Sequence, residues 1–125
     1  MPWLAVAAGG ALGAVARYAM AGAVQRVAGG AFPWGTLAVN ILGALLMGVV
    51  VEGSARLWNI PADLRLFLTT GILGGFTTFS AFSLETALII EKGDWMPAIA
   101  YIAASVALTV LFLFCGMWAV RSFAG

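Results

Sequence analysis

Four long apolar stretches follow one another along this chain of 125 residues, and they constrain its fold more than any other feature. They lie at about residues 3–24, 35–53, 64–91 and 96–121. A helix needs ~20 predominantly apolar residues to cross the ~30 Å hydrocarbon core of a bilayer. Because four such stretches use up nearly the whole chain, we expect one all-α transmembrane domain over residues 1–125. Membrane lipid would surround it, and no soluble domain is expected.

The inventory of side chains argues against enzyme chemistry. The chain has no histidine, and its single cysteine, Cys115, lies within the last apolar stretch. Imidazole groups and paired thiolates, which commonly serve as bases, nucleophiles and soft-metal ligands, are therefore missing. We expect a protein that is not an enzyme and that has no nucleic-acid partner.

The basic residues divide equally between the two sides of the membrane if the four stretches alternate in direction. One side would carry Arg17, Arg26 and Lys92, and the other Arg56, Arg65 and Arg121. Since an excess of basic residues normally marks the cytoplasmic side, equal numbers favour insertion in both orientations. Two oppositely inserted copies can pair as an antiparallel homodimer. The alternative is one fixed orientation, with one or two of these charges assigned here to the wrong side.

The third stretch has a glycine-rich centre that disfavours a continuous helix. Gly71, Gly74 and Gly75 lie within five residues of one another and are followed by two threonines. Glycine costs ~1 kcal/mol relative to alanine inside a helix. We therefore expect a third helix that is broken at mid-membrane depth, between Thr69 and Ser83, where freed backbone groups can coordinate an ion. The alternative is a kinked helix that uses its glycines only for packing.

Phenylalanines follow these glycines at every third position. Phe76, Phe79 and Phe82 would project along one face of a continuing helix. Such a row usually packs in a core or against lipid. An aromatic ring nevertheless has a positive edge, so rings presented edge-on can stabilise a small anion weakly, and weak binding suits conduction.

Hydroxyl groups recur on one side of the fourth stretch. Tyr101, Ser105 and Thr109 follow one another at intervals of four residues and form a stripe ~12 Å long. Hydrogen bonding between helices and a polar track explain this stripe equally well. Together with Ser80 and Ser83, it could supply O–H donors to an anion that is losing its water.

Two more polar side chains lie inside the apolar stretches. Asn40 lies about a turn and a half inside the second, where a carboxamide either bonds a neighbouring helix or lines a pathway. Taken by itself, the residue favours a bond between helices. Arg17 lies near the end of the first, where it either anchors the helix at the interface or attracts anions to an entry vestibule.

Small residues and a polar segment complete the pattern. Gly9 and Gly13 form a small-xxx-small pair that predicts a close approach between helix backbones. The segment from Glu52 to Asp63 contains acidic residues and a proline, and we interpret it as a solvated connector between the second and third spans.

Three segments resemble a known family: Gly10–Tyr18, Trp34–Gly43 and, most specifically, Gly71–Glu85. Over essentially its whole length the sequence resembles the Fluc (CrcB) fluoride channels. The resemblance implies four spans with a broken third helix, a dual-topology antiparallel homodimer, and passive, selective export of fluoride across the bacterial inner membrane. One departure is Ala81, where threonine is frequent; it removes a hydroxyl group and leaves the key positions intact.

The resemblance also implies roles for individual residues. The fluoride pathway would be formed by Phe79, Phe82, Asn40, Tyr101, Ser105 and Thr109, with Ser80 and Ser83 beside them. Arg17 matches a vestibule arginine. Gly74 and Thr77 match positions whose backbone carbonyls, from both subunits, hold a structural sodium ion at the dimer centre. Glu85 matches a recurring carboxylate with a gating or structural role.

The rival interpretation is a proton-coupled small multidrug exporter, which has a similar length, the same number of spans and the same capacity for dual topology. Such transporters depend on a glutamate inside the first span. The first apolar stretch of this chain has no acidic residue, which favours the channel.

Overall fold

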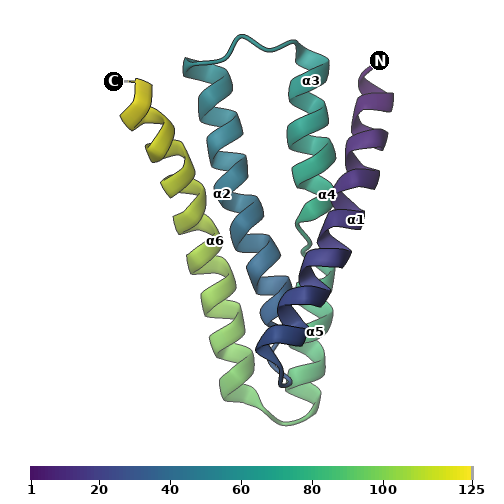
Figure 1. Cartoon of the computed structure of the whole chain (residues 1–125). Coiled ribbons are helices and arrows are strands. Elements are labelled where there is room, and N and C mark those ends of the chain that lie inside the picture. The colour runs from purple at the N-terminus through teal and green to yellow at the C-terminus, as the bar shows by residue number, and fades with distance from the viewer. Residues whose placement is uncertain (125) are drawn as a thin grey trace.

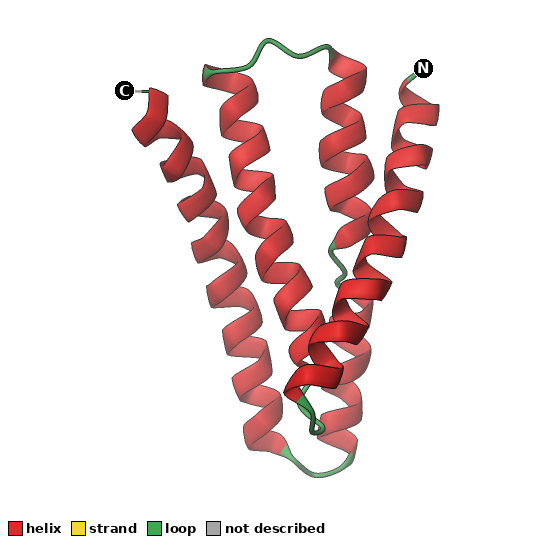
Figure 2. Cartoon of the chain, viewed as in Figure 1, coloured by secondary structure: helices red, strands yellow, loops and turns green. Residues whose placement is uncertain are grey.

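The computed structural model describes residues 1–124, and every regular element within them is a helix (Figures 1 and 2). The elements are α1 (Pro2–Ala28), α2 (Trp34–Arg56), α3 (Ala62–Leu66), the π-helix η1 (Phe67–Leu73), α4 (Gly74–Phe76), α5 (Ser80–Glu91) and α6 (Trp95–Ala124). Four segments are long and apolar enough to cross a membrane: residues 2–28, 34–56, 62–91 and 95–124. The third of these contains α3, η1, α4 and α5.

The four segments run in alternating directions, so that both termini lie at the same end of the bundle (Figure 1). Much of the outer surface of this single chain is apolar. Large side chains such as Trp3, Val27 and Phe123 are more than four-fifths exposed. Fully buried large side chains are few; they are Tyr101 and Val39. Because contiguous apolar surface of this extent is rare on a soluble monomer, the bundle is built to contact lipid or other protein.

Glycines bring α1 against the first half of the third segment, at η1 and α4. The small-xxx-small pair predicted such a close approach between helix backbones. A Cβ atom at Gly9 would lie 2.8 Å from the Cα atom of Gly71, and one at Gly13 would collide with the carbonyl group of Ile72. On the opposite side of the contact, a Cβ atom at Gly75 would lie 2.6 Å from a backbone oxygen of α1. Any side chain at these positions would push the two backbones apart.

Glycines also allow α2 and α6 to pack closely. A Cβ atom at Gly48 would collide with the carbonyl oxygen of Leu113, and one at Gly116 with the carbonyl oxygen of Leu45. Glycines thus allow close backbone contacts between α1 and η1 with α4, between α2 and α6, and, at Gly35, between α2 and α1.

The irregularity of the third segment lies within the predicted range, Thr69 to Ser83, but after the glycines rather than at them. The glycines at 71, 74 and 75 are helical, in η1 and α4. Residues 77–79 lie outside any helix, and Thr77 has an extended backbone with φ −91° and ψ 158°. The glycines remain helical because they provide the close contact with α1, whose backbone supports them. We refer to Thr77, Thr78 and Phe79 as the non-helical segment.

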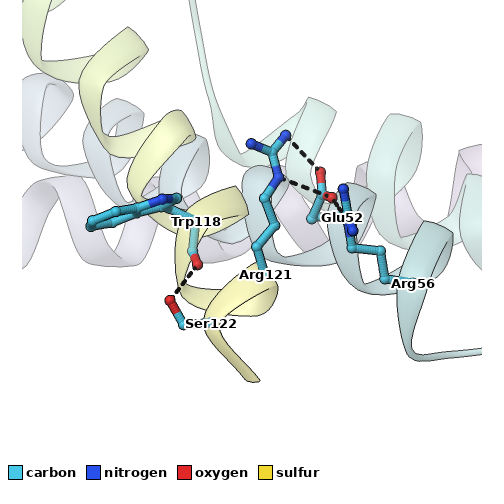
Figure 3. Close-up of polar contacts among 5 residues, drawn as sticks. All are labelled: Glu52, Arg56, Trp118, Arg121 and Ser122. Atoms are coloured by element: carbon cyan, nitrogen blue, oxygen red, sulfur yellow. Dashed lines mark hydrogen bonds and ion pairs between the residues drawn. The ribbon is translucent and has the colours of Figure 1, made fainter. Parts of the chain in front are cut away.

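The predicted connector from Glu52 to Asp63 is wrong at both ends. Helix α2 continues to Arg56, and α3 begins at Ala62. Glu52 is buried within α2 and forms ion pairs with Arg56 and Arg121 (Figure 3). The sequence placed this carboxylate in solvent because its partner on α6 is 69 residues away along the chain.

Candidate functional site

A cavity of about 340 Å³ opens between α2, the non-helical segment, α5 and α6. It is lined by Asn40, Gly43, Ala44, Met47, Thr77, Thr78, Phe79, Phe82, Ser105, Val106, Thr109 and Leu113. None of these side chains is charged. The cavity thus brings together five predicted pathway residues that are distant in sequence: Asn40, Phe79, Phe82, Ser105 and Thr109.

Asn40 holds the non-helical segment through two hydrogen bonds to the same residue. Its amide nitrogen Nδ2 donates to the carbonyl oxygen of Thr78 at 3.0 Å, and its Oδ1 accepts from the backbone N–H of Thr78 at 2.8 Å. Both backbone groups of Thr78 would otherwise lie unpaired at membrane depth, where each is costly. Asn40 therefore links α2 to the third segment by hydrogen bonds, the role that the residue by itself suggested. It also lines the cavity.

Thr78 is a residue whose importance the sequence did not reveal. Its hydroxyl oxygen accepts a hydrogen bond from the backbone N–H of Ala81 at 3.1 Å, in the first turn of α5. This is the bond that a threonine makes at a helix start. A threonine just before the start of a helix is a sequence signal for this role. The signal could not be used here, because the sequence did not show where the interruption ends and α5 begins.

The interruption releases backbone carbonyl groups of α4 and of the non-helical segment. In a continuous helix the carbonyls of Gly74 and Thr77 would accept from the N–H groups of Thr78 and Ala81. Those two N–H groups instead donate to the Asn40 side chain and to the Thr78 hydroxyl. Gly74 is also exposed, and a Cβ atom built on it would meet only one backbone oxygen, at 3.5 Å.

The cavity wall carries donors that the chain itself does not use. The hydroxyl group of Ser105 is buried and has no hydrogen-bond partner among residues 1–124. By contrast, the Thr109 hydroxyl donates to the carbonyl oxygen of Ser105 at 2.5 Å. A carboxamide has two N–H donors, and Thr78 takes one of those on Asn40. Ser105 thus retains an unpaired O–H, and Asn40 retains a second N–H, among the residues that line the cavity.

Two phenylalanine rings also line the cavity. The ring centroids of Phe79 and Phe82 are 5.4 Å apart. Phe82 is buried, whereas Phe79 is 77% exposed on the isolated chain. Phe76 does not share their face: it is buried in α4, before the interruption, and does not line the cavity. The predicted row of three is therefore a pair.

Three predicted pathway residues do not line the cavity. Tyr101 is buried against Phe82, with ring centroids 5.0 Å apart, and its hydroxyl donates to Glu85 Oε1 at 3.2 Å. Ser80 and Ser83 lie on the exposed side of α5. Helical spacing alone could not show that Tyr101 packs in the core whereas Ser105 lines the cavity. The two residues lie on the same stripe of α6 and differ in the size of their side chains.

Arg17 lies deeper than an interface anchor. About three turns of α1 follow it, and its Nε donates to the carbonyl oxygen of Gly75 at 3.1 Å. It lines a second cavity, of about 260 Å³, together with Tyr18, Ala21, Gly22, Gln25, Gly35, Thr36 and Glu85. The structure thus places Arg17 and Glu85 at one polar cavity and separates both from the neutral one.

A family model described as "CrcB-like protein, Camphor Resistance (CrcB)" matches residues 4–117. A fluoride-specific ion channel FluC of Chelativorans sp. (strain BNC1) is 51% identical over 117 residues, covering 94% of each chain. The protein of the same name from Geobacter sulfurreducens is 51% identical over 118 residues, covering 94% of this chain and 95% of the relative. With matches of this extent and four apolar helices, this chain is a multi-pass membrane protein and belongs to the CrcB family.

Proposed function

We propose that this protein is a passive ion channel that selects fluoride and lets it leave the bacterial cytoplasm across the inner membrane. The observation that carries the proposal is the uncharged cavity beside the non-helical segment, with the unpaired Ser105 hydroxyl in its wall. Relatives about 50% identical to this chain are named fluoride-specific ion channels.

The chemistry of the cavity suits a small anion that moves on. Fluoride loses water only where donors replace it, and the Ser105 O–H and the remaining Asn40 N–H are such donors. The positive edges of Phe79 and Phe82 add weak stabilisation. Because no lining residue is cationic, the anion is not trapped, and conduction requires such weak binding.

We further propose that two oppositely oriented copies form the working channel. Phe79, in the non-helical segment, and Gly74, three residues before it, are both exposed on one copy. A partner placed against this region would cover the Phe79 ring and bring two non-helical segments together. Pathway residues would then lie on both sides of the contact.

A structural sodium ion fits the same region. Within residues 1–124 no three His, Cys, Asp or Glu side chains come together as a metal site. The carbonyl oxygens of Gly74 and Thr77 have lost their helical partners, and carbonyl oxygens suit hard cations. Two copies would supply four such oxygens, and a bound sodium would fix the two non-helical segments against each other.

Flux from liposomes tests the function. Purified protein should release trapped fluoride passively and far faster than chloride, measured with ion-selective electrodes. Fluoride release no faster than from protein-free liposomes would refute the channel. Uptake of a cationic dye that requires a proton gradient would favour the exporter instead.

A further inference from the structure

The most organised group of charges outside the cavity lies at the end of the bundle that holds both termini. The carboxylate of Glu52, whose side chain is 8% exposed, pairs with Arg56 of α2 and Arg121 of α6 (Figure 3). The Nε of Arg121 is 3.2 Å from Oε2 of Glu52, and its Nη2 is 3.4 Å from Oε1. One carboxylate cannot neutralise two guanidinium groups, so the cluster carries a net positive charge.

Both guanidinium groups remain available on their outer side. The side chains of Arg56 and Arg121 are 50% and 44% exposed. Among residues 1–124, Arg56 uses only its Nε atom, and Arg121 leaves Nη1 without an acceptor. A guanidinium group presents five N–H donors in a planar fork that matches a phosphate group. Because Glu52 already orients both forks, little side-chain entropy would be lost on binding a phosphate.

Two tryptophans place this cluster at the level of lipid headgroups. Trp118 lies one turn before Arg121 on α6 and is 71% exposed (Figure 3). Trp58 lies just after α2, is 45% exposed, and packs its ring on Gly53, the residue after Glu52. Tryptophan is enriched at the membrane–water interface.

The two ends of the bundle differ in charge. The end with the cluster carries three described basic side chains, Arg56, Arg65 and Arg121, against two acidic ones, Glu52 and Asp63. The other end balances Arg26 and Lys92 against Glu91 and Asp94. Attraction of an anionic headgroup is therefore expected at the end with the cluster.

We propose that Arg56 and Arg121, held in place by Glu52, form a binding site for the phosphate group of an anionic phospholipid. Phosphatidylglycerol has the required chemistry, because no cationic group of its own offsets the phosphate. Trp118 and Trp58 would lie at the boundary between its headgroup and its acyl chains. This site is separate from the neutral cavity and does not depend on the ion that the cavity conducts.

Lipid retention by the purified full-length protein tests the site. Native mass spectrometry would measure the ratio of phosphatidylglycerol to phosphatidylcholine bound from an equimolar mixture. Each basic residue near an anionic surface contributes about a fivefold preference, so Arg121→Gln and Arg56→Gln should each lower the ratio about fivefold. Arg26→Gln makes the same charge change at the balanced end and should leave the ratio unaltered.

Two results would overturn the proposal. One is a wild-type ratio in both Arg121→Gln and Arg56→Gln; the other is an equal fall in Arg26→Gln, which would reduce the effect to net charge. If Arg121→Gln does not give monodisperse protein, Arg56→Gln decides alone, since its half-exposed side chain lies at the very end of α2.

Discussion

Replacing Asn40 with alanine should impair fluoride conduction by releasing the non-helical segment. The two hydrogen bonds between the Asn40 side chain and the backbone of Thr78 would both be lost. The Thr78 N–H and C=O groups would then have no partner among the contacts that the structure shows. The position of Phe79, the next residue, depends on that backbone.

The size of the effect follows from these two bonds. Hydrogen bonds between membrane helices average about 0.6 kcal/mol each, so the pair contributes about 1.2 kcal/mol. If this energy holds the segment in its conducting form, its loss lowers the ratio of conducting to non-conducting forms about eightfold. The cost rises to about 1–3 kcal/mol for each backbone group that stays dry and unpaired.

Fluoride efflux from liposomes at matched protein content would measure this loss, with gel filtration to confirm the assembly. Ser54→Ala is the matched control, because Ser54 also lies on α2 and donates only to the carbonyl of Val50, away from the segment. Wild-type efflux through Asn40→Ala would refute the reasoning, since the segment would then need no support from α2.

Three further changes test other parts of the structure. Gly13→Ala should destabilise the fold by about 1–3 kcal/mol, the usual cost of overpacking, and so lower the midpoint of unfolding in detergent. Gly10→Ala, whose Cβ would meet nothing within 4 Å, should leave the midpoint unchanged. Equal midpoints for the two variants would contradict the packing argument. Phe82→Ile should cut fluoride efflux about tenfold, equivalent to ~1.4 kcal/mol, and leave the oligomer intact by gel filtration; unchanged efflux would remove the ring from the mechanism. Ser105→Ala deletes the unpaired hydroxyl and should slow efflux without loss of stability, whereas Ser122→Ala, which removes a bond to the Trp118 carbonyl at the far end of α6, should not; equal rates would exclude the hydroxyl as a donor.

The sequence predicted what depends on local composition. The four spans follow from runs of apolar residues, and a close approach of another helix at Gly9 follows from small residues four apart. The family signature also selected Asn40, Phe82 and Ser105, which the structure brings to one cavity. None of these predictions needed knowledge of distant contacts.

What the sequence could not predict depends on contacts between distant segments. The glycines of the third segment are helical and pack against α1, and within the predicted range the interruption falls after them, at residues 77–79. Arg17 was placed near the interface, but its Nε donates to the carbonyl oxygen of Gly75, in the turn before that interruption. Glu52 looked solvated because Arg121 is far along the chain. In each case a partner from another helix decided the outcome.

The most direct test of passive conduction is fluoride efflux from liposomes with the membrane potential set by potassium and valinomycin and the pH held equal on both sides. The account predicts that efflux follows the potential and proceeds without any proton gradient, while chloride stays trapped. Efflux that appears only when a proton gradient is imposed, or that never exceeds that of protein-free liposomes, would contradict it.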